Sequence, residues 1–186
     1  YKLLRKAYEK ADLKTDPDYA EFLKEEKDWL QDYCLFMAIK NDQKGICWID
    51  WPEELKDRHS KAVKEAEKEL AEEIEFYRFQ QYCFTTQWRK LKAYANKKDI
   101  SIIGDVPIYV ALDSSDAWAN PEMLQFDEDY NPKAVAGCPP DAFSATGQLW
   151  GNPLYDWKAL KKDGYGWWVQ RMTCLLYTSP SPRDRT

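Results

Sequence analysis

The chain has 186 residues, of which 44% are hydrophobic and 32% charged, so it can bury a core and is not a disordered polypeptide. Its net charge of −5 gives it no electrostatic attraction to nucleic acid or to an anionic membrane. No apolar run is near the roughly 20 residues that span a bilayer, and no signal peptide opens the sequence. Aromatic residues reach 15%, which is typical of a heavy core or of a platform for ring-shaped ligands.

The histidine and cysteine content argues against metal sites and disulfides. His59 is the single histidine, and we expect neither a metal nor an organic cofactor. The cysteines are odd in number, form no CxxC pair and are irregularly spaced, which excludes a disulfide framework or a zinc site. They are Cys34, Cys47, Cys83, Cys138 and Cys174. We expect buried free thiols in a reducing cytoplasm, and therefore a cytoplasmic protein.

Residues 1–98 are predicted to be helical. Apolar residues recur at helical spacing over residues 22–39, and Asn41–Gly45 breaks the pattern. A second, longer pattern begins at Asp57 or Ser60, either of which could cap it, and continues to Ala95. Two polar residues, Glu67 and Gln81, interrupt its apolar stripe. The charged run KEAEKELAEEIE is interpreted as a solvated helix face.

The pattern changes after residue 99 to ISIIGDVPIYVA. The isoleucines at positions 100, 102 and 103 are β-branched and are followed by Gly104-Asp105, which predicts a buried strand that ends at a corner. A helix that leads into a buried strand is one step of an α/β layer or barrel. In parallel barrels, polar residues at the carboxyl end of a strand face the active site, and Asp105 has this position.

Regular periodicity is absent from Asp113 to Tyr155, where prolines and glycines are frequent. More than forty residues without regular structure are unusual in a compact domain and indicate a functional loop. A short helix is predicted from Trp157 to about Met172.

The end of this loop, residues 135–155, has the composition of a sugar-binding surface. Neutral polar side chains alternate with aromatic rings, and sugars need hydrogen bonds for their hydroxyl groups and a flat ring against their C–H face. The residues displayed are Asp141, Phe143, Ser144, Gln148, Trp150, Asn152 and Tyr155. The alternative is a structural loop that its Trp and Tyr only anchor.

Residues 174–186, CLLYTSPSPRDRT, differ in character from the rest of the chain and have no periodicity. A disordered tail is one explanation. We favour another, because CLLYTSPSPRD resembles the translation of a sequencing adapter, in which case the natural protein continues differently after Thr173. We therefore leave this tail out of the predictions of fold and function.

Several long strings resemble the 4-α-glucanotransferases, the amylomaltases or disproportionating enzymes of glycoside hydrolase family 77. They are WPEELKDR, EIEFYRFQQYCFTTQWRKLKAYA, GDVPIYVALDSSDAWANPEM and AVAGCPPDAFSATGQLWGNPLYDW, and the resemblance runs through roughly residues 19–172. Cys138 is a departure, since valine is more usual there.

The resemblance implies an α/β fold, namely a fragment of an α-amylase-type (β/α)₈ TIM barrel with a largely helical insertion. Residues 1–98 would supply the insertion and barrel-surface helices, and residues 99–173 a barrel strand and the glucan-binding loop. Asp105 would help to shape the site of the scissile glucose. The loop residues that would cover the glucan are Asp141, Phe143, Ser144, Gln148 and Trp150, while Asn152 and Tyr155 are weaker candidates that would brace the loop.

The activity implied is the retaining transfer of α-1,4-glucan segments between maltooligosaccharides, without metal or cofactor. The family's nucleophile lies in an RIDHFRG-like motif, which is absent from this sequence, as are its acid/base glutamate and second aspartate. We therefore expect this polypeptide to be inactive by itself. We also expect it to be poorly soluble or molten, because a partial barrel leaves strand edges unpaired.

Three other functions stay open at this stage. The chain could be a non-catalytic α-glucan-binding module that uses Phe143 and Trp150. It could be a helical interaction protein, although that would give the Pro- and Trp-rich loop no purpose. It could also belong to a hydrolytic relative in which water replaces the acceptor sugar. The oligomeric state is not predicted.

Overall fold

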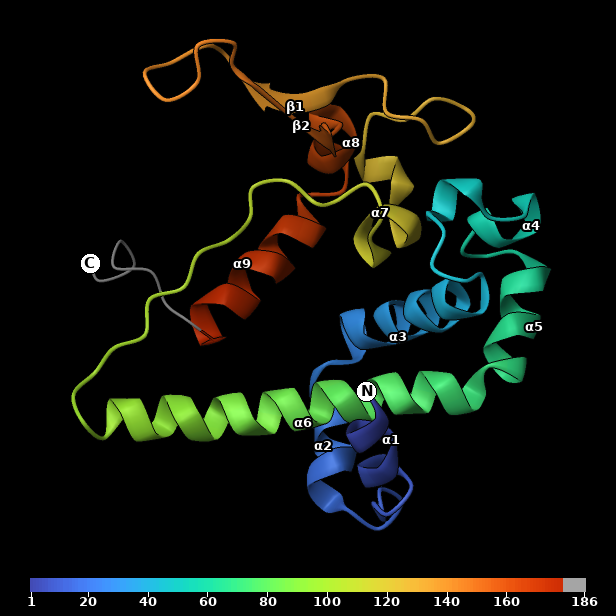
Figure 1. Cartoon of the computed structure of the whole chain (residues 1–186), viewed down its shortest axis with the longest axis vertical. Coiled ribbons are helices and arrows are strands. Elements are labelled where there is room, and N and C mark those ends of the chain that lie inside the picture. Colours follow the sequence, from blue (N-terminus) through green and yellow to red (C-terminus); the bar gives the residue numbers. More distant parts are fainter. Residues whose placement is uncertain (179–186) are drawn as a thin grey trace. The chain divides into compact units, whose positions relative to one another are not determined.

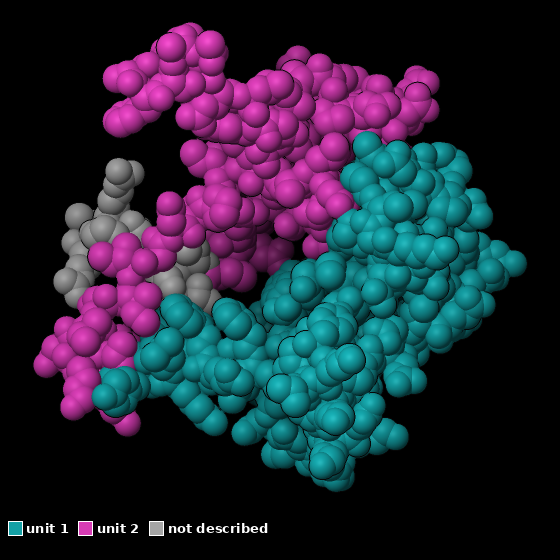
Figure 2. All heavy atoms as spheres, viewed as in Figure 1, with its two compact units in different colours: residues 1–94 teal, residues 95–186 magenta. Residues whose placement is uncertain are grey.

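The computed structural model describes residues 1–178, with side chains as far as Cys174. The chain divides into two compact units, residues 1–94 and 95–186 (Figure 2). No helix in the described part of the chain is long and apolar enough to cross a membrane.

The first unit is helical, as the sequence predicts (Figure 1). Its α-helices are α1 (Lys2–Tyr8), α2 (Pro17–Glu25), α3 (Lys27–Asp42), α4 (Glu53–Lys56), α5 (Lys61–Glu69) and α6 (Ala71–Asn96), with a 3₁₀ turn, η1 (Trp48–Asp50). Helix α2 begins where Asp16 accepts hydrogen bonds from the N–H groups of Asp18 and Tyr19, and Pro17 follows in the first helical position.

The core of this unit lies between α2, α3 and α6 and is rich in aromatic rings. Its fully or almost fully buried side chains include Tyr19, Phe22, Leu30, Cys34, Leu35, Ile39, Trp48, Trp51, Ile74 and Phe76. Burial raises the pKa of the Cys34 thiol to about 12, so this thiol is protonated at neutral pH. The prediction of buried free thiols is confirmed at Cys34 and is wrong at Cys174, which is exposed, while Cys47, Cys83 and Cys138 are half-buried.

The prediction of a single long helix from residue 57 or 60 to 95 is wrong in one respect. The structure has two helices there, α5 and α6, which meet at a bend (Figure 1). Ser60 caps the first, accepting from Val63 N at 3.0 Å. The backbone leaves helical geometry at Leu70, where φ is −97° and ψ is 17°. The apolar stripe is buried at Val63 and through the first half of α6, but Phe84 and Leu91 are exposed. The second half of α6 therefore has an apolar face that this unit does not cover.

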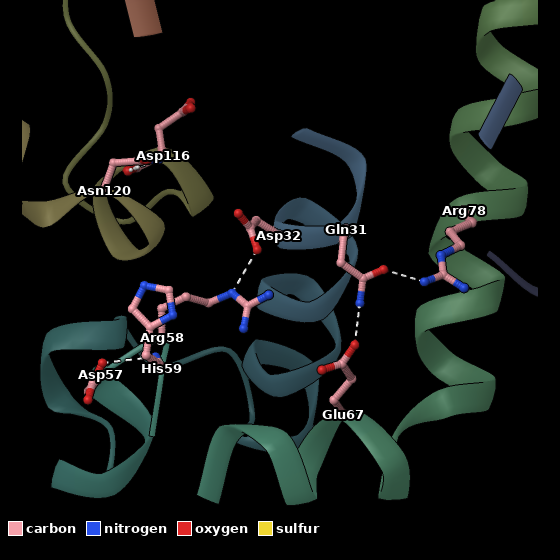
Figure 3. Close-up of polar contacts among 9 residues, drawn as sticks. All are labelled: Gln31, Asp32, Asp57, Arg58, His59, Glu67, Arg78, Asp116 and Asn120. Atoms are coloured by element: carbon pink, nitrogen blue, oxygen red, sulfur yellow. Dashed lines mark hydrogen bonds and ion pairs between the residues drawn. The ribbon is translucent and has the colours of Figure 1, made fainter. Parts of the chain in front are cut away.

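Polar side chains join three helices of this unit (Figure 3). Gln31 on α3 accepts from Arg78 on α6 and donates to Glu67 on α5 at 2.6 Å. Arg58, in the turn before α5, pairs with Asp32 on α3 at 2.7 Å. Glu67, which interrupts the apolar stripe in the sequence, thus lies on the packed face because α3 supplies it with a hydrogen-bond donor.

The second unit contains short helices and one small sheet. The elements are α7 (Ser115–Ala119), η2 (Pro121–Met123), β1 (Val135–Cys138), β2 (Gln148–Pro153), α8 (Trp157–Lys162) and α9 (Gly166–Thr178). The strands form an antiparallel hairpin in which Val135 pairs with Pro153 and Cys138 with Gln148. The prediction that residues 113–155 lack regular structure is therefore wrong in part, because a hairpin and two short helical turns form within them.

The buried strand predicted at residues 100–103 is not formed in this structure. Residues 101–107 belong to no helix or strand, and Ile103 is 61% exposed. Strand residues need a neighbouring strand for their backbone N–H and C=O groups, and within residues 1–178 the sheet consists of β1 and β2 alone. The described residues accordingly contain no closed barrel.

The helix predicted from Trp157 to Met172 is interrupted at Gly164 and Tyr165, both of which have positive φ. Its second part, α9, continues to Thr178, so residues 174–178 of the tail are helical. The rest of the tail, residues 179–186, lies outside the described residues. Its origin from an adapter stays a prediction.

We predict that Asp16 makes the first unit sensitive to acid. The hydrogen bond from the Tyr82 hydroxyl, with those from the backbone at Tyr19 and Asp18, holds the pKa of Asp16 below its usual 3.8. Because the pKa is lowered in the folded state, the stability it contributes is present above about pH 4 and is lost as the pH falls through the lowered value. Asp16→Asn keeps a capping side chain, so the unfolding free energy should depend less on pH below about 4.

This is checked by urea unfolding at several pH values, followed by tryptophan fluorescence. Asp28→Asn, at an exposed aspartate on α3, is the control and should leave the acid dependence unchanged. Equal acid dependence in Asp16→Asn and the unsubstituted chain would contradict the prediction.

Candidate glucan-binding site

The loop between β1 and β2 is folded by its own polar groups. The Asp141 carboxylate accepts from the N–H groups of Phe143 and Ser144, both at 2.8 Å. The Asp141 N–H donates to the Ser144 carbonyl at 3.0 Å, and the Ser144 hydroxyl donates to the Gly147 carbonyl at 2.8 Å. Asp141 and Ser144, two of the predicted site residues, therefore give the loop its shape, because they satisfy backbone groups that no strand pairs.

Two glycines are required where the hairpin closes. At Gly147 φ is +73°, and a Cβ atom there would lie 2.5 Å from the Cys138 carbonyl oxygen. At Gly137 a Cβ atom would lie 2.4 Å from the Gln148 carbonyl oxygen. Neither distance leaves room for a side chain, so the close approach of the two strands depends on glycine at both positions.

The hairpin presents aromatic rings outward. Phe143 lies at the tip of the loop and is 95% exposed, and Trp150 on β2 is 50% exposed. The Trp150 indole N–H donates to the Gln148 side-chain oxygen at 2.9 Å, which fixes the direction of the ring. Exposed rings beside amide and carboxylate groups form a surface suited to the apolar and polar faces of a sugar.

The hairpin thus brings together six of the eight residues predicted for the site, and Asp105 and Tyr155 lie outside it. Asp105 lies on the extended segment after residue 100, is exposed, and accepts from Val106 N at 2.8 Å. This segment reaches the hairpin further along, since the Asn152 side chain on β2 donates to the Val110 carbonyl at 2.9 Å. The Asn152 amide is therefore engaged with the backbone.

Tyr155 is the centre of an aromatic cluster behind the hairpin. Its side chain is 2% exposed, and its hydroxyl donates to the Ile108 carbonyl at 2.9 Å. The surrounding rings, with centroids 5.2–6.1 Å away, are Tyr109, Trp157, Trp167 and Trp168. Burial raises the pKa of the Tyr155 phenol, so the hydroxyl remains a hydrogen-bond donor.

Sequence reasoning missed two residues of this region, Tyr109 and Arg171. The Tyr109 ring lies between Trp150, at 6.3 Å, and Tyr155, on which it stacks at an interplanar angle of 14°. Arg171 on α9 donates to the Pro107 carbonyl at 2.7 Å, with its guanidinium 4.9 Å from the centre of the Trp167 ring. The sequence could have indicated Tyr109, because it is an aromatic residue only four positions after Asp105. No local sequence pattern indicates Arg171.

Within the part of the chain whose side chains are described, no three His, Cys, Asp or Glu residues are grouped so as to hold a metal ion.

A family model described as 4-alpha-glucanotransferase matches residues 1–179. The chain belongs to the 4-alpha-glucanotransferase family. It is 50% identical over 176 residues to a 4-alpha-glucanotransferase of Clostridium butyricum, with 94% of this chain and 36% of the relative covered. It is 48% identical over 168 residues to the 4-alpha-glucanotransferase of Thermus thermophilus, with 90% and 34% covered.

A solved structure, the amylomaltase from Streptococcus agalactiae in complex with acarbose, superimposes with a TM-score of 0.88 at 39% sequence identity. The match covers 95% of this chain and 36% of that one. The chain therefore spans about a third of the length of the relatives it matches. The resemblance inferred from the sequence is confirmed, and the family is one of enzymes classified under EC 2.4.1.25.

We predict that Gly147→Ala opens the hairpin loop. The added methyl group would meet the Cys138 carbonyl, and a left-handed backbone costs a residue other than glycine about 1–2 kcal/mol. The amide signals of residues 141–150 in an NMR spectrum should broaden or shift, and the loop hydrogen bonds should lose protection from exchange. Ala145→Gly, in the same loop, is the control and should preserve these signals. An unchanged spectrum for Gly147→Ala would contradict the geometry.

Proposed function

We propose that this chain is part of a 4-α-glucanotransferase that transfers α-1,4-glucan segments between maltooligosaccharides. The observation that carries the proposal is the family match over residues 1–179. The acarbose complex of the similar amylomaltase supports an α-glucan as the ligand. Asp105 and the hairpin residues are the proposed contacts, with Phe143 and Trp150 packing on sugar rings and Gln148 offering hydrogen bonds.

The proposed complete protein is an α-amylase-type (β/α)₈ barrel. In it residues 1–98 form the helical insertion and surface helices, and residues 99–173 a strand with its active-site loop. A neighbouring strand would pair with residues 100–103, which would restore the predicted strand there. Asp105 would then follow the carboxyl end of this strand, on the face where barrel enzymes hold their substrates.

The proposed reaction is a retaining double displacement. A carboxylate attacks the anomeric carbon while a carboxylic acid, roughly 5–5.5 Å away, protonates the departing oxygen. The 4-hydroxyl of a second glucan then gives its proton to the deprotonated acid and attacks the anomeric carbon, which breaks the bond to the enzyme carboxylate. The exposed rings of the hairpin would favour this acceptor over water by covering the bound glucan.

The present chain should not catalyse this reaction alone, because the RIDHFRG-like motif of the family's nucleophile is not in its sequence. A cytoplasmic location and the absence of a cofactor belong to the same proposal. Hydrolysis with water as the acceptor is a variant of the reaction that the product analysis below distinguishes.

A non-catalytic α-glucan-binding module is the second candidate. It is favoured by the shape of the loop, whose internal hydrogen bonds hold Phe143 outward without help from any other part of a barrel. In that case the chain alone would bind maltoheptaose and would have no transferase activity.

The proposal is tested by placing residues 1–173 in the Clostridium butyricum relative, in exchange for the matching segment. This chimaera is termed the complete enzyme below. With maltotriose it should form glucose together with longer maltooligosaccharides, whereas a hydrolase would form glucose and maltose without longer products. A folded complete enzyme that forms no longer products would refute the proposal. Binding of maltoheptaose by the 186-residue chain, measured calorimetrically, would then favour the module.

The role of Trp150 is tested in the complete enzyme with Trp150→Ala. Loss of the ring from a sugar contact should raise KM for maltotriose about 10-fold or more, because an aromatic platform of this kind contributes on the order of 1–2 kcal/mol. Leu149→Ala, at the exposed neighbour on the opposite face of β2, is the control and should keep its KM. Unchanged kinetics in Trp150→Ala would remove Trp150 from the site.

A further inference from the structure

The segment that follows Asp105 is held in an unusual way. Among the described residues, positions 101–111 make no backbone-to-backbone hydrogen bonds. An extended segment without such bonds has no ladder to fix its path, and its carbonyl groups must be satisfied by other donors.

Side chains supply those donors. Ser114 donates to the carbonyl of Ala111, the last residue of the segment, at 2.7 Å. Closer to Asp105 there are three donors, two from the end of β2 and one from α9. Arg171 on α9 donates to the Pro107 carbonyl at 2.7 Å, Tyr155 to Ile108 at 2.9 Å, and Asn152 on β2 to Val110 at 2.9 Å. All three acceptors lie within five residues of Asp105. Two of the donors, Asn152 and Tyr155, flank the end of the strand that carries Trp150.

The donors are themselves held in place. Tyr155 is buried and stacks on Tyr109, which belongs to the clamped segment. The Arg171 guanidinium lies over Trp167, whose indole N–H donates to Asp116 at 3.2 Å. Side chains whose positions are restricted by packing in turn restrict the positions of the groups they bind.

We propose that Arg171, Tyr155 and Asn152 form a clamp of positioning residues, which fixes the backbone after Asp105 and thereby couples the placement of Asp105 to that of the hairpin. The clamp acts beyond the predicted end of the strand, where barrel pairing stops, so it is needed even when residues 100–103 have a neighbouring strand. This inference rests on the proposed function, and it assigns Asn152 to the backbone rather than to the sugar.

The clamp predicts a particular kinetic signature. Misplacement of a group near the reacting centre by about 1 Å can lower the rate about 100-fold, while distant sugar contacts are kept. Loss of a clamp donor should therefore lower kcat of the complete enzyme about 10- to 100-fold and change KM less than about 3-fold. This is the reverse of the effect expected for Trp150→Ala, which acts on KM.

The experiment uses two variants that remove the donor and keep the packing. Tyr155→Phe retains the stacked ring, and Arg171→Met retains an apolar stem on Trp167. Tyr165→Phe, at a half-exposed tyrosine for which no hydroxyl hydrogen bond is described, is the matched control and should keep both constants. Arg171→Lys keeps a donor and should recover part of the kcat that Arg171→Met loses.

Folding is followed by circular dichroism and by the thermal midpoint, with kinetics measured well below the midpoint. If kcat falls only in proportion to the folded fraction, the three residues have a structural role and the clamp is refuted. If Tyr155→Phe and Arg171→Met retain kcat in an active enzyme that Asp105→Asn inactivates, the clamp alone is refuted. If Asp105→Asn is fully active, both the clamp and the assignment of Asp105 fail, while transfer by the complete enzyme remains established.

Discussion

The second unit depends on the burial of Tyr155 with its hydroxyl satisfied. The ring fills the space among four other aromatic rings, and the hydroxyl reaches the carbonyl of Ile108. Burying the Tyr155 hydroxyl without a hydrogen-bond acceptor would cost free energy. The aromatic cluster is therefore favoured when the Ile108 carbonyl lies next to this hydroxyl. That one requirement ties the end of β2, helix α9 and the segment after Asp105 to each other, although residues in contact are up to 64 positions apart in the chain.

The hydrogen-bonding groups of the backbone are satisfied in different ways in the two units. In the first, backbone groups pair within the helices, Asp16 and Ser60 cap helix starts, and Gln31 and Arg58 join one helix to the next. In the second, loops are abundant, and side chains of Asp141, Ser144, Asn152, Tyr155 and Arg171 bind backbone groups directly. Its fold thus depends on individual polar residues more than on periodic patterns.

This difference explains what the sequence could predict. Helices are local, so the helical character of residues 1–98 was predicted correctly, and of the two caps predicted for the long helix Ser60 is the one used. A strand needs partners, and the described chain has none for residues 100–103, so the strand predicted there is not formed in this structure. The hairpin was missed because its pairing depends on Gly137 and Gly147 permitting close approach, which periodicity does not record. The site residues in the loop followed from composition and resemblance, whereas Arg171 could not be found, since its acceptor lies 64 residues away.

In the hairpin loop, the residues that determine the backbone conformation differ from the residue whose side chain is presented to solvent. Its shape comes from Asp141, Ser144 and Gly147, which bind to one another and to the loop backbone, whereas the Phe143 side chain extends into solvent. The backbone N–H of Phe143 takes part in the shape, and its ring does not. Position 143 can therefore be exchanged among most amino acids without a change in the architecture around it. For protein engineering, a library of substitutions at codon 143 would therefore change the side chain presented to a ligand while the conformation of the loop stays the same.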